Sequence, residues 1–115
     1  MSHVSPEAVV QLQLDAYNAR DLHRFLAAYS DEVRIFRPPD TAASIVGKPA
    51  LAEYYATQRF NLVGLRAEVV NRMVLGNKVV DHERISGVRE VPFDVAAVFE
   101  VADGLIRTVW FFAAE

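Results

Sequence analysis

The sequence predicts an α+β fold, in which a curved antiparallel sheet wraps around three N-terminal helices as a cone-shaped α+β barrel. Apolar residues at helical spacing occupy the first third of the chain, and alternating strand patterns occupy its second half. Helices followed by an antiparallel meander favour α+β over alternating βαβ units. The length of 115 residues suits one domain, which we expect over residues 1–115.

Two helices are predicted at the start of the chain, each behind a residue that caps helices well. Ser5 offers a hydroxyl N-cap before a proline, and the first helix runs to about Asn18. Asp21 caps the second helix. The apolar residues of this helix recur at i, i+3, i+4 and i+7, the pattern of one buried face: Leu22, Phe25, Leu26 and Tyr29.

The middle of the chain contains one strand and one helix. Apolar and charged residues alternate over 33–37, and the β-branched residues among them favour a short strand. A double proline ends that strand, and residues 38–47 form a loop. The third helix begins at a Lys-Pro pair and covers about residues 48–60.

Four strands follow, over residues 65–75, 78–86, 93–101 and 105–113. The link between the first two has only two residues, Gly76-Asn77, which signals a β-hairpin. Three helices can cover only one face of a sheet of four or five strands. If the sheet curls around the helices, it forms a cone with a cavity at its mouth.

The strand over 93–101 carries apolar residues on both of its faces. One alternating set faces the helices, but the other set still holds Ala96 and Val98, which a solvated face rarely carries. We therefore expect a second copy of the chain to cover the outer face, so that the protein is a homodimer through the sheet.

Composition and charge argue against several function classes. Twelve Lys and Arg against fifteen Asp and Glu give a net charge of −3, without the basic excess of a nucleic-acid binder. No apolar run approaches the roughly 18 residues of a membrane span. The sequence has no phosphate loop, dinucleotide fingerprint or metal-ligand spacing, so we expect no cofactor and no metal. The absence of cysteine and of a signal-peptide pattern in the first seven residues leads us to expect a cytoplasmic protein.

Several segments, taken together, resemble the nuclear transport factor 2-like superfamily. Residues 15–22 and 25–33 are similar to its opening helices, 47–51 to the start of its third helix, and 98–111 to its closing hairpin. The resemblance implies a cystatin-like topology and is strongest to the bacterial SnoaL-like and steroid-isomerase-like branches. These branches contain isomerases, epoxide hydrolases and polyketide cyclases, so the fold alone does not decide the function.

The catalytic carboxylates of these relatives are missing. The three roles of a ketosteroid isomerase fall on Gln13, Arg37 and Ala97, and a guanidinium is not a base at neutral pH. The resemblance to limonene-type epoxide hydrolases covers residues 83–86, but serine stands where those enzymes have an aspartate. Residues 109–112, where their second aspartate would lie, contain no acid.

His82 and Arg84 are the candidate catalytic residues. They lie two residues apart on one strand, so their side chains leave the same face. The epoxide-hydrolase resemblance implies that this face is the inner one, and the ordinary pKa of histidine suits acid–base chemistry. The alternative is a structural role, in which Arg84 pairs with a carboxylate across the sheet, either Asp94 or Glu100.

Aromatic residues are the expected lining of the cavity, and five of them are candidate ligand-binding residues: Tyr17, Phe36, Tyr55, Trp110 and Phe112. We expect a pocket that binds an apolar small molecule, with isomerase-, cyclase- or hydrolase-like chemistry. The alternatives are a binding protein without catalysis and a module whose main role is dimerisation. An open cavity that contains His82 and Arg84 would favour the first two functions over the third.

Overall fold

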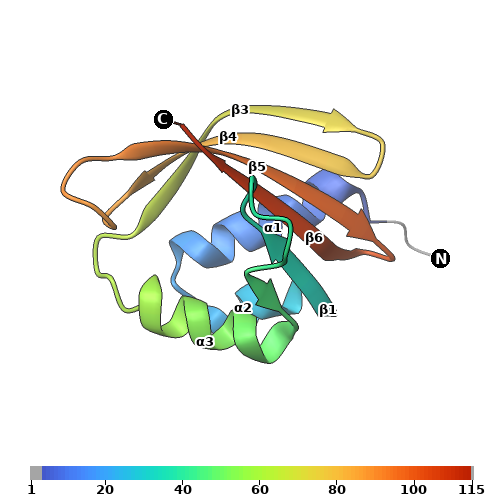
Figure 1. Ribbon diagram of the computed structural model, residues 1–115, viewed down its shortest axis with the longest axis horizontal. Coiled ribbons are helices and arrows are strands. Elements are labelled where there is room, and N and C mark those ends of the chain that lie inside the picture. Colours follow the sequence, from blue (N-terminus) through green and yellow to red (C-terminus); the bar gives the residue numbers. More distant parts are fainter. Residues whose placement is uncertain (1–3, 115) are drawn as a thin grey trace.

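Six strands and three helices make up the computed structural model, which describes residues 4–114 (Figure 1). Part of the N-terminal segment that we compared with signal peptides therefore lies outside the described residues. The elements are α1 (Pro6–Asn18), α2 (Leu22–Ala27), β1 (Tyr29–Phe36), β2 (Ile45–Val46), α3 (Lys48–Gln58), β3 (Arg66–Leu75), β4 (Lys78–Ser86), β5 (Phe93–Ala102) and β6 (Leu105–Ala113). The predicted α+β fold class and its element order are confirmed, with one strand more than expected.

The strands form one sheet in the order β2-β1-β6-β5-β4-β3. The chain from β3 to β6 is an antiparallel meander, whereas β1 pairs with β6 in parallel. The unpredicted strand β2 pairs with β1 at Ile45 and Val46, inside the segment expected to be a loop. Two residues are too few to show alternation, so this strand exists only through its pairing with β1.

The second helix is shorter than its apolar spacing suggested. It ends at Ala27, and Tyr29 is already the first residue of β1, where it pairs with Ile106 of β6. The backbone N–H of Ile106 also donates to the carbonyl of Ala28 at 2.9 Å. Pairing with β6 thus overrides the helical spacing of Tyr29, because long-range hydrogen bonds outweigh a weak local preference.

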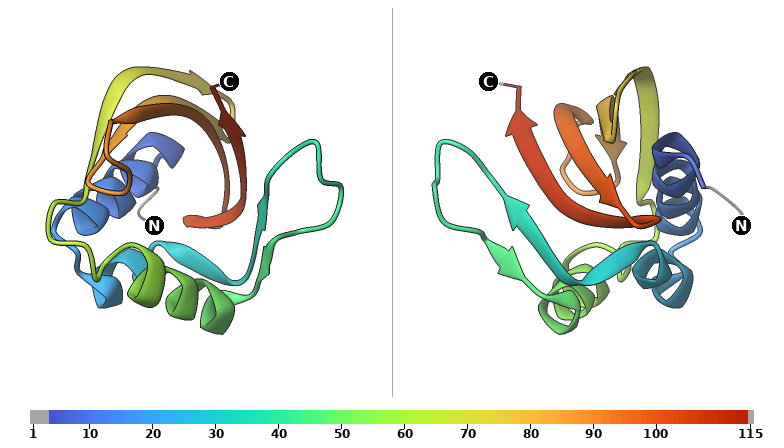
Figure 2. Two further views of the ribbon diagram at one scale, coloured as in Figure 1. Left: turned by 60° about the vertical axis from the view of Figure 1, so that its left-hand side comes forward. Right: turned by 90° about the vertical axis from the view of Figure 1, so that its right-hand side faces the viewer.

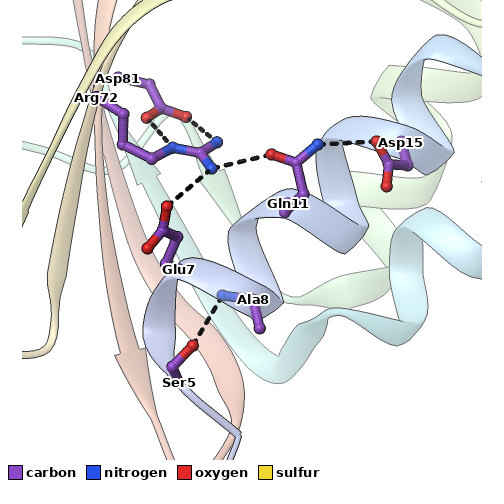
Figure 3. Close-up of polar contacts among 7 residues, drawn as sticks. All are labelled: Ser5, Glu7, Ala8, Gln11, Asp15, Arg72 and Asp81. Atoms are coloured by element: carbon purple, nitrogen blue, oxygen red, sulfur yellow. Dashed lines mark hydrogen bonds and ion pairs between the residues drawn. The ribbon is translucent and has the colours of Figure 1, made fainter.

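Helix α1 is held against the sheet at both ends. Near its start, Glu7 and Gln11 both approach Arg72 of β3, with 2.9 Å from Arg72 Nη1 to Gln11 Oε1 (Figure 3). At its end, the Asn18 side chain accepts from the backbone N–H of Ala67 and donates to its carbonyl, at 2.7 and 2.9 Å. The side-chain amide of Asn18 therefore makes both backbone hydrogen bonds that a neighbouring strand would otherwise make with Ala67 of β3. The expected caps are also present, since Ser5 accepts from the N–H of Ala8.

The sheet curls, and its concave face packs against the helices. Strands β3 to β6 arch over α1, while α2 and α3 lie below (Figure 2). Register shifts in β3 between Val69 and Asn71, and in β5 between Glu100 and Val101, add bend to the sheet. The concave face contributes much of the buried core: Val33, Ile35, Val79, Ala97, Phe99, Val101, Ile106 and Val109.

The turn between β4 and β5 approaches the segment before β3 very closely. Gly87 has a φ of +85 degrees, and a Cβ atom there would lie 2.2 Å from the carbonyl oxygen of Gly64. Only glycine fits this contact, since both the positive φ and the close backbone exclude a side chain. The contact lies just beyond the Arg66–Ser86 pair of β3 and β4.

Candidate functional site

A cavity of about 70 Å³ lies between the helices and the concave face of the sheet. It is open at one end, where several of its lining residues are half-buried rather than buried. The lining residues come from α1, from α3 and its end, and from the inner face of the sheet. They are Gln13, Leu14, Tyr17, Tyr29, Arg37, Tyr54, Tyr55, Arg59, Ala67, Glu83, Ile85, Phe93, Val95, Phe99 and Phe111. The cavity is therefore lined mainly by aromatic and aliphatic side chains with a few polar groups, which is the usual character of a small-molecule site.

Glu83 is the carboxylic acid of this lining. It lies on β4 with only 6% of its surface exposed. No hydrogen bond within the described residues reaches its carboxyl group, whereas every fully buried polar side-chain atom there has a partner. The Glu83 oxygens must therefore retain some access to the cavity. Burial, followed by repulsion from the Asp81 carboxylate, raises the pKa of Glu83 from 4.5 to about 8, against the opposing charge of Arg72.

Arg72, the cation that acts on Glu83, already forms an ion pair with Asp81. Asp81 is fully buried two residues before Glu83, and Arg72 donates to both of its carboxylate oxygens at 2.7 and 2.9 Å (Figure 3). Such a two-point ion pair is among the stronger polar contacts in proteins. Arg72 thus compensates the charge of Asp81, and Glu83 is left as a buried acid that is protonated at neutral pH.

Neutral hydroxyl groups line the same cavity. Burial raises the pKa of Tyr17 to about 12, and it raises the pKa values of Tyr29 and Tyr55 still further. The Tyr29 hydroxyl donates to the side-chain carbonyl of Gln13 at 3.1 Å. These phenols remain protonated across the physiological range, so they act as hydrogen-bond donors rather than as bases.

Two arginines stand at the open end. The guanidinium carbon of Arg37 lies 6.0 Å from the Tyr54 ring centre and 5.0 Å from that of Phe111, and the guanidinium carbon of Arg59 lies 5.5 Å from the Tyr54 ring centre. Both side chains are half-buried and both line the cavity. The mouth of the cavity is therefore positively charged and aromatic, in contrast to its neutral interior.

His82 and Arg84 lie on the opposite face of the sheet, so the expectation that they point into the cavity was wrong. Their side chains are 45% and 47% exposed, and both contact Asp94 of β5, at 2.7 Å from His82 and 3.0 Å from Arg84. For Arg84 this is the structural pairing that we considered as the alternative, whereas the contact of His82 with the same carboxylate was not expected. Hydrogen bonds from Arg84 and then His82 lower the pKa of Asp94.

The reason lies in the alternation along β4. Val79 and Ile85 are buried in the core, and they share their parity with Asp81 and Glu83. Placing His82 inward would turn Val79 and Ile85 to the outer face, which costs more than burying two carboxyl groups with one arginine. This parity was a signal in the sequence that could have identified Glu83.

The five predicted ligand-binding aromatics divide between the two faces. Tyr17 and Tyr55 line the cavity, and their role in binding stays a prediction. The other three do not line it. Trp110 stacks on Phe36 at 6.1 Å on the outer face, and Phe112 is 43% exposed. On β6 the inward positions belong to Val109 and Phe111, because side chains alternate between the faces of a strand.

Sequence reasoning also missed other polar groups of the cavity. Gln13 and Arg37 had been considered only as replacements for catalytic residues of relatives, yet both line the cavity with Arg59. Arg37 comes directly after β1 and has the parity of the inward Ile35, whereas Arg59 enters from the C-cap of α3. A residue at a helix end has no strand parity, so no pattern in the sequence could have placed Arg59 there. Among residues 4–114, no three His, Asp or Glu side chains are arranged to hold a metal ion.

Comparison with known proteins agrees with this architecture. The family model described as SnoaL-like domain matches residues 10–109. No curated protein matches the chain. None of the described helices is long and apolar enough to cross a membrane.

Solved structures with the same fold carry different activities in their descriptions. A proposed ketosteroid isomerase from Kribbella flavida has 20% identity and a TM-score of 0.82, over 96% of this chain and 78% of that one. An LEH-like epoxide hydrolase from Mycobacterium tuberculosis has 21% identity and a TM-score of 0.80, over 95% and 82%. A proposed polyketide cyclase from Sinorhizobium meliloti has 18% identity and a TM-score of 0.77, over 90% and 92%. At these identities the likeness concerns the fold alone.

Proposed function

Since the chain belongs to the SnoaL-like domain family of the nuclear transport factor 2-like superfamily, we propose that its cavity binds a small apolar molecule and that Glu83 exchanges a proton with it. The observation that carries this proposal is a buried carboxyl group at the cavity surface with no protein partner. An acid with a pKa of about 8 is protonated at neutral pH, and only a small free energy separates its two forms. This is the range in which general acid–base catalysis works best.

The groups around Glu83 support a proton transfer next to a carbonyl or a related oxygen. In its acidic form Glu83 donates to an oxygen atom on which negative charge develops. In its ionised form it removes a proton from a carbon next to a carbonyl group. The neutral hydroxyl of Tyr17 lines the same cavity and can donate a hydrogen bond to the enolate that results, and the surrounding aromatic wall excludes water. Isomerase- and cyclase-like reactions use such steps, and a hydrolase-like reaction would use the same carboxyl group to move a proton of water.

A binding protein without catalysis is the second candidate function. Glu83 is the one carboxyl group among the lining residues, and Gln13 and Arg37 occupy the places of a catalytic phenol and base in the steroid isomerases that the chain resembles. A single acid suffices to move one proton, but it cannot divide acid and base roles between two groups. Both candidate functions use the same cavity, and they differ only in whether the bound molecule reacts.

A second copy of the chain is the proposed partner of the outer sheet face. Five apolar side chains lie in one row across five strands, by the pairings Met73–Val80, Val80–Val98, Val98–Trp110 and Trp110–Phe36. We call these five residues the outer apolar row. Of these residues Met73 is 55% exposed, and the helices cover only the other face. The other four are half-buried, and an apolar row of this extent that no helix covers is typical of an interface.

Charges on both sides of the outer apolar row suit a copy of the same surface. One side holds Lys78 and Arg107 around Glu100, and the other holds His82 and Arg84 around Asp94. A two-fold axis through the row exchanges these two sides. Each side contains both signs of charge, so the exchange creates opposite-charge contacts without a net like-charge clash.

The expected cytoplasmic location stays a prediction.

Hydrogen–deuterium exchange into a ketone tests the proton transfer. In D₂O, wild-type protein should accelerate exchange of the methyl protons of acetophenone, because Glu83 can remove and return them. Glu83→Gln keeps the shape but cannot accept a proton, so exchange should fall by about 100-fold or more, the usual contribution of a general base. Glu68→Gln, which changes an exposed glutamate on β3, is the matched control.

Two outcomes separate the candidate functions. Equal exchange by wild type and Glu83→Gln would refute the catalytic role. If ligand resonances shift in the presence of protein while exchange stays at the uncatalysed rate, the cavity binds without turnover and the second candidate holds.

A further inference from the structure

The two arginines at the cavity mouth, Arg37 and Arg59, are half-buried, unlike the exposed Arg34 and Arg66 of the sheet. Arg72, Arg84 and Arg107 each pair with a carboxylate. Among the ion pairs of residues 4–114, none involves Arg37 or Arg59. Two half-buried cations beside one aromatic ring, without a counter-ion, indicate a place for an anion.

The contacts that these arginines do make leave most of their donors free. Arg37 rests on the rings of Tyr54 and Phe111. Arg59 rests on Tyr54, donates one hydrogen bond to the carbonyl of Gln58 at 2.8 Å and also interacts with the hydroxyl of Tyr17. A ring face satisfies part of the charge of a guanidinium but accepts none of its in-plane N–H groups. Each guanidinium has five such donors, and their geometry matches a carboxylate.

The interior of the cavity favours the opposite kind of group. Glu83 carries its proton at neutral pH, and the nearby phenols are neutral. The charge of Arg72 is already taken by Asp81. An anion would therefore gain nothing at the closed end, whereas a neutral oxygen there can accept a hydrogen bond from Glu83. Between the two ends, Phe93, Val95 and Phe99 form an apolar wall.

From this polarity we infer that the cavity takes a compact aromatic monocarboxylate, with its carboxylate at Arg37 and Arg59 and a neutral oxygen-bearing group directed at Glu83. The cavity of about 70 Å³ is smaller than the 150 Å³ chamber that accommodates benzene in an engineered core. Only part of such a ligand enters the closed end, and its charged end stays at the mouth. This inference names the ligand class and rests on the proposed function of the same cavity.

Two probes that differ only in charge test the inference. 4-Acetylbenzoate and 4-acetylbenzamide share the ring and the exchangeable acetyl group, but only the first carries a carboxylate. Titration followed by NMR should give a dissociation constant for 4-acetylbenzoate at least about 10-fold lower than for the amide, because a charge-assisted contact contributes that much or more. Arg37→Gln and Arg59→Gln should each remove about 10-fold of the affinity for the benzoate and change that for the amide less than twofold.

Control variants separate local from general charge effects. Arg66→Gln removes an exposed arginine of β3 and should leave both affinities unchanged. Glu83→Gln should retain the preference for 4-acetylbenzoate, because the carboxylate contacts the arginines and not Glu83. Thermal unfolding of each variant verifies that the protein is folded, and Arg37→Lys retains the charge if the glutamine variant does not fold.

The possible failures have different meanings. Equal affinities for the two probes, or an effect of Arg66→Gln as large as that of Arg37→Gln, would overturn the monocarboxylate inference while leaving Glu83-dependent exchange into acetophenone intact. Binding of neither probe would overturn both the inference and the proposed binding function. Binding governed by the arginines, together with exchange that does not depend on Glu83, would support the inference and refute only the proton transfer.

Discussion

Arg72 of β3 and Asp81 of β4 face each other on the concave side of the sheet, with Arg72 Nε 2.7 Å from Asp81 Oδ1 and Arg72 Nη2 2.9 Å from Asp81 Oδ2. Glu83 follows Asp81 on the same face of β4, and no such partner lies opposite it, because its neighbour across β3 is Val69. One arginine thus serves two inward carboxyl groups. This unequal sharing makes Asp81 structural and leaves Glu83 available to a ligand.

The first prediction concerns the pH dependence of stability. The pKa of Glu83 is about 8 in the folded state and near its ordinary value of 4.5 in the unfolded chain. Between these values the folded state keeps the proton and the unfolded state has lost it, so stability falls as the pH rises through this window. The slope is about 1.4 kcal/mol per pH unit. Glu83→Gln should lack this slope in urea unfolding measured from pH 5 to 9, and parallel curves for the two proteins would contradict the assignment.

The second prediction concerns the buried ion pair between Arg72 and Asp81. Arg72→Met leaves the fully buried Asp81 without its cation and should destabilise the protein by about 3–5 kcal/mol. The double change of Arg72→Met with Asp81→Leu should recover most of this loss, since an apolar pair has no charge to compensate. Arg107→Met removes a more exposed partner of Glu100 and should cost about 1 kcal/mol or less. If Arg72→Met unfolds at the same urea concentration as Arg107→Met, the buried ion pair of Arg72 contributes no more to stability than the exposed pair of Arg107, which would contradict this prediction.

The third prediction uses two glycines with similar backbone angles. Gly87→Ala places a methyl group 2.2 Å from the Gly64 carbonyl oxygen, whereas at Gly76, with a φ of +60, nothing lies within 4 Å. Gly76→Ala should cost only the conformational penalty of about 1–2 kcal/mol. Gly87→Ala adds a steric clash of about 1–3 kcal/mol and should therefore lose clearly more stability. Equal losses in thermal or urea unfolding would show that the Gly64–Gly87 contact is not as close as described.

The fourth prediction concerns the outer apolar row. Wild-type protein should be a dimer at micromolar concentration in light scattering, and Trp110→Glu should be a monomer, because it places a charge at the centre of the interface. Val63→Glu changes a valine that is 86% exposed in a loop and should leave the dimer intact. A monomeric wild type would refute the proposed sheet-face dimer, and so would a Trp110→Glu variant that remains dimeric.

Local chemistry explains which parts of this fold are predictable from the sequence. The caps at Ser5 and Asp21 and the residue limits of β4 and β6 follow from short-range patterns, because capping hydrogen bonds and turn residues act over a few positions. The short strand β2 and the change from helix to strand at Tyr29 do not. Both depend on a partner strand that the local sequence does not specify.

The candidate site depended on one further fact, namely which face of β4 is the inner one. Alternation along the strand places His82 and Arg84 on one face and Asp81 and Glu83 on the other. The parity of Val79 and Ile85 favours the carboxyl groups as the inner set, but Val80 shares the parity of His82, so the choice is made by packing, which buries Val79 and Ile85 and sets Arg72 opposite Asp81. The mouth arginine Arg59 likewise reaches the cavity through the end of α3, and its position depends on helix packing rather than on any pattern in the chain.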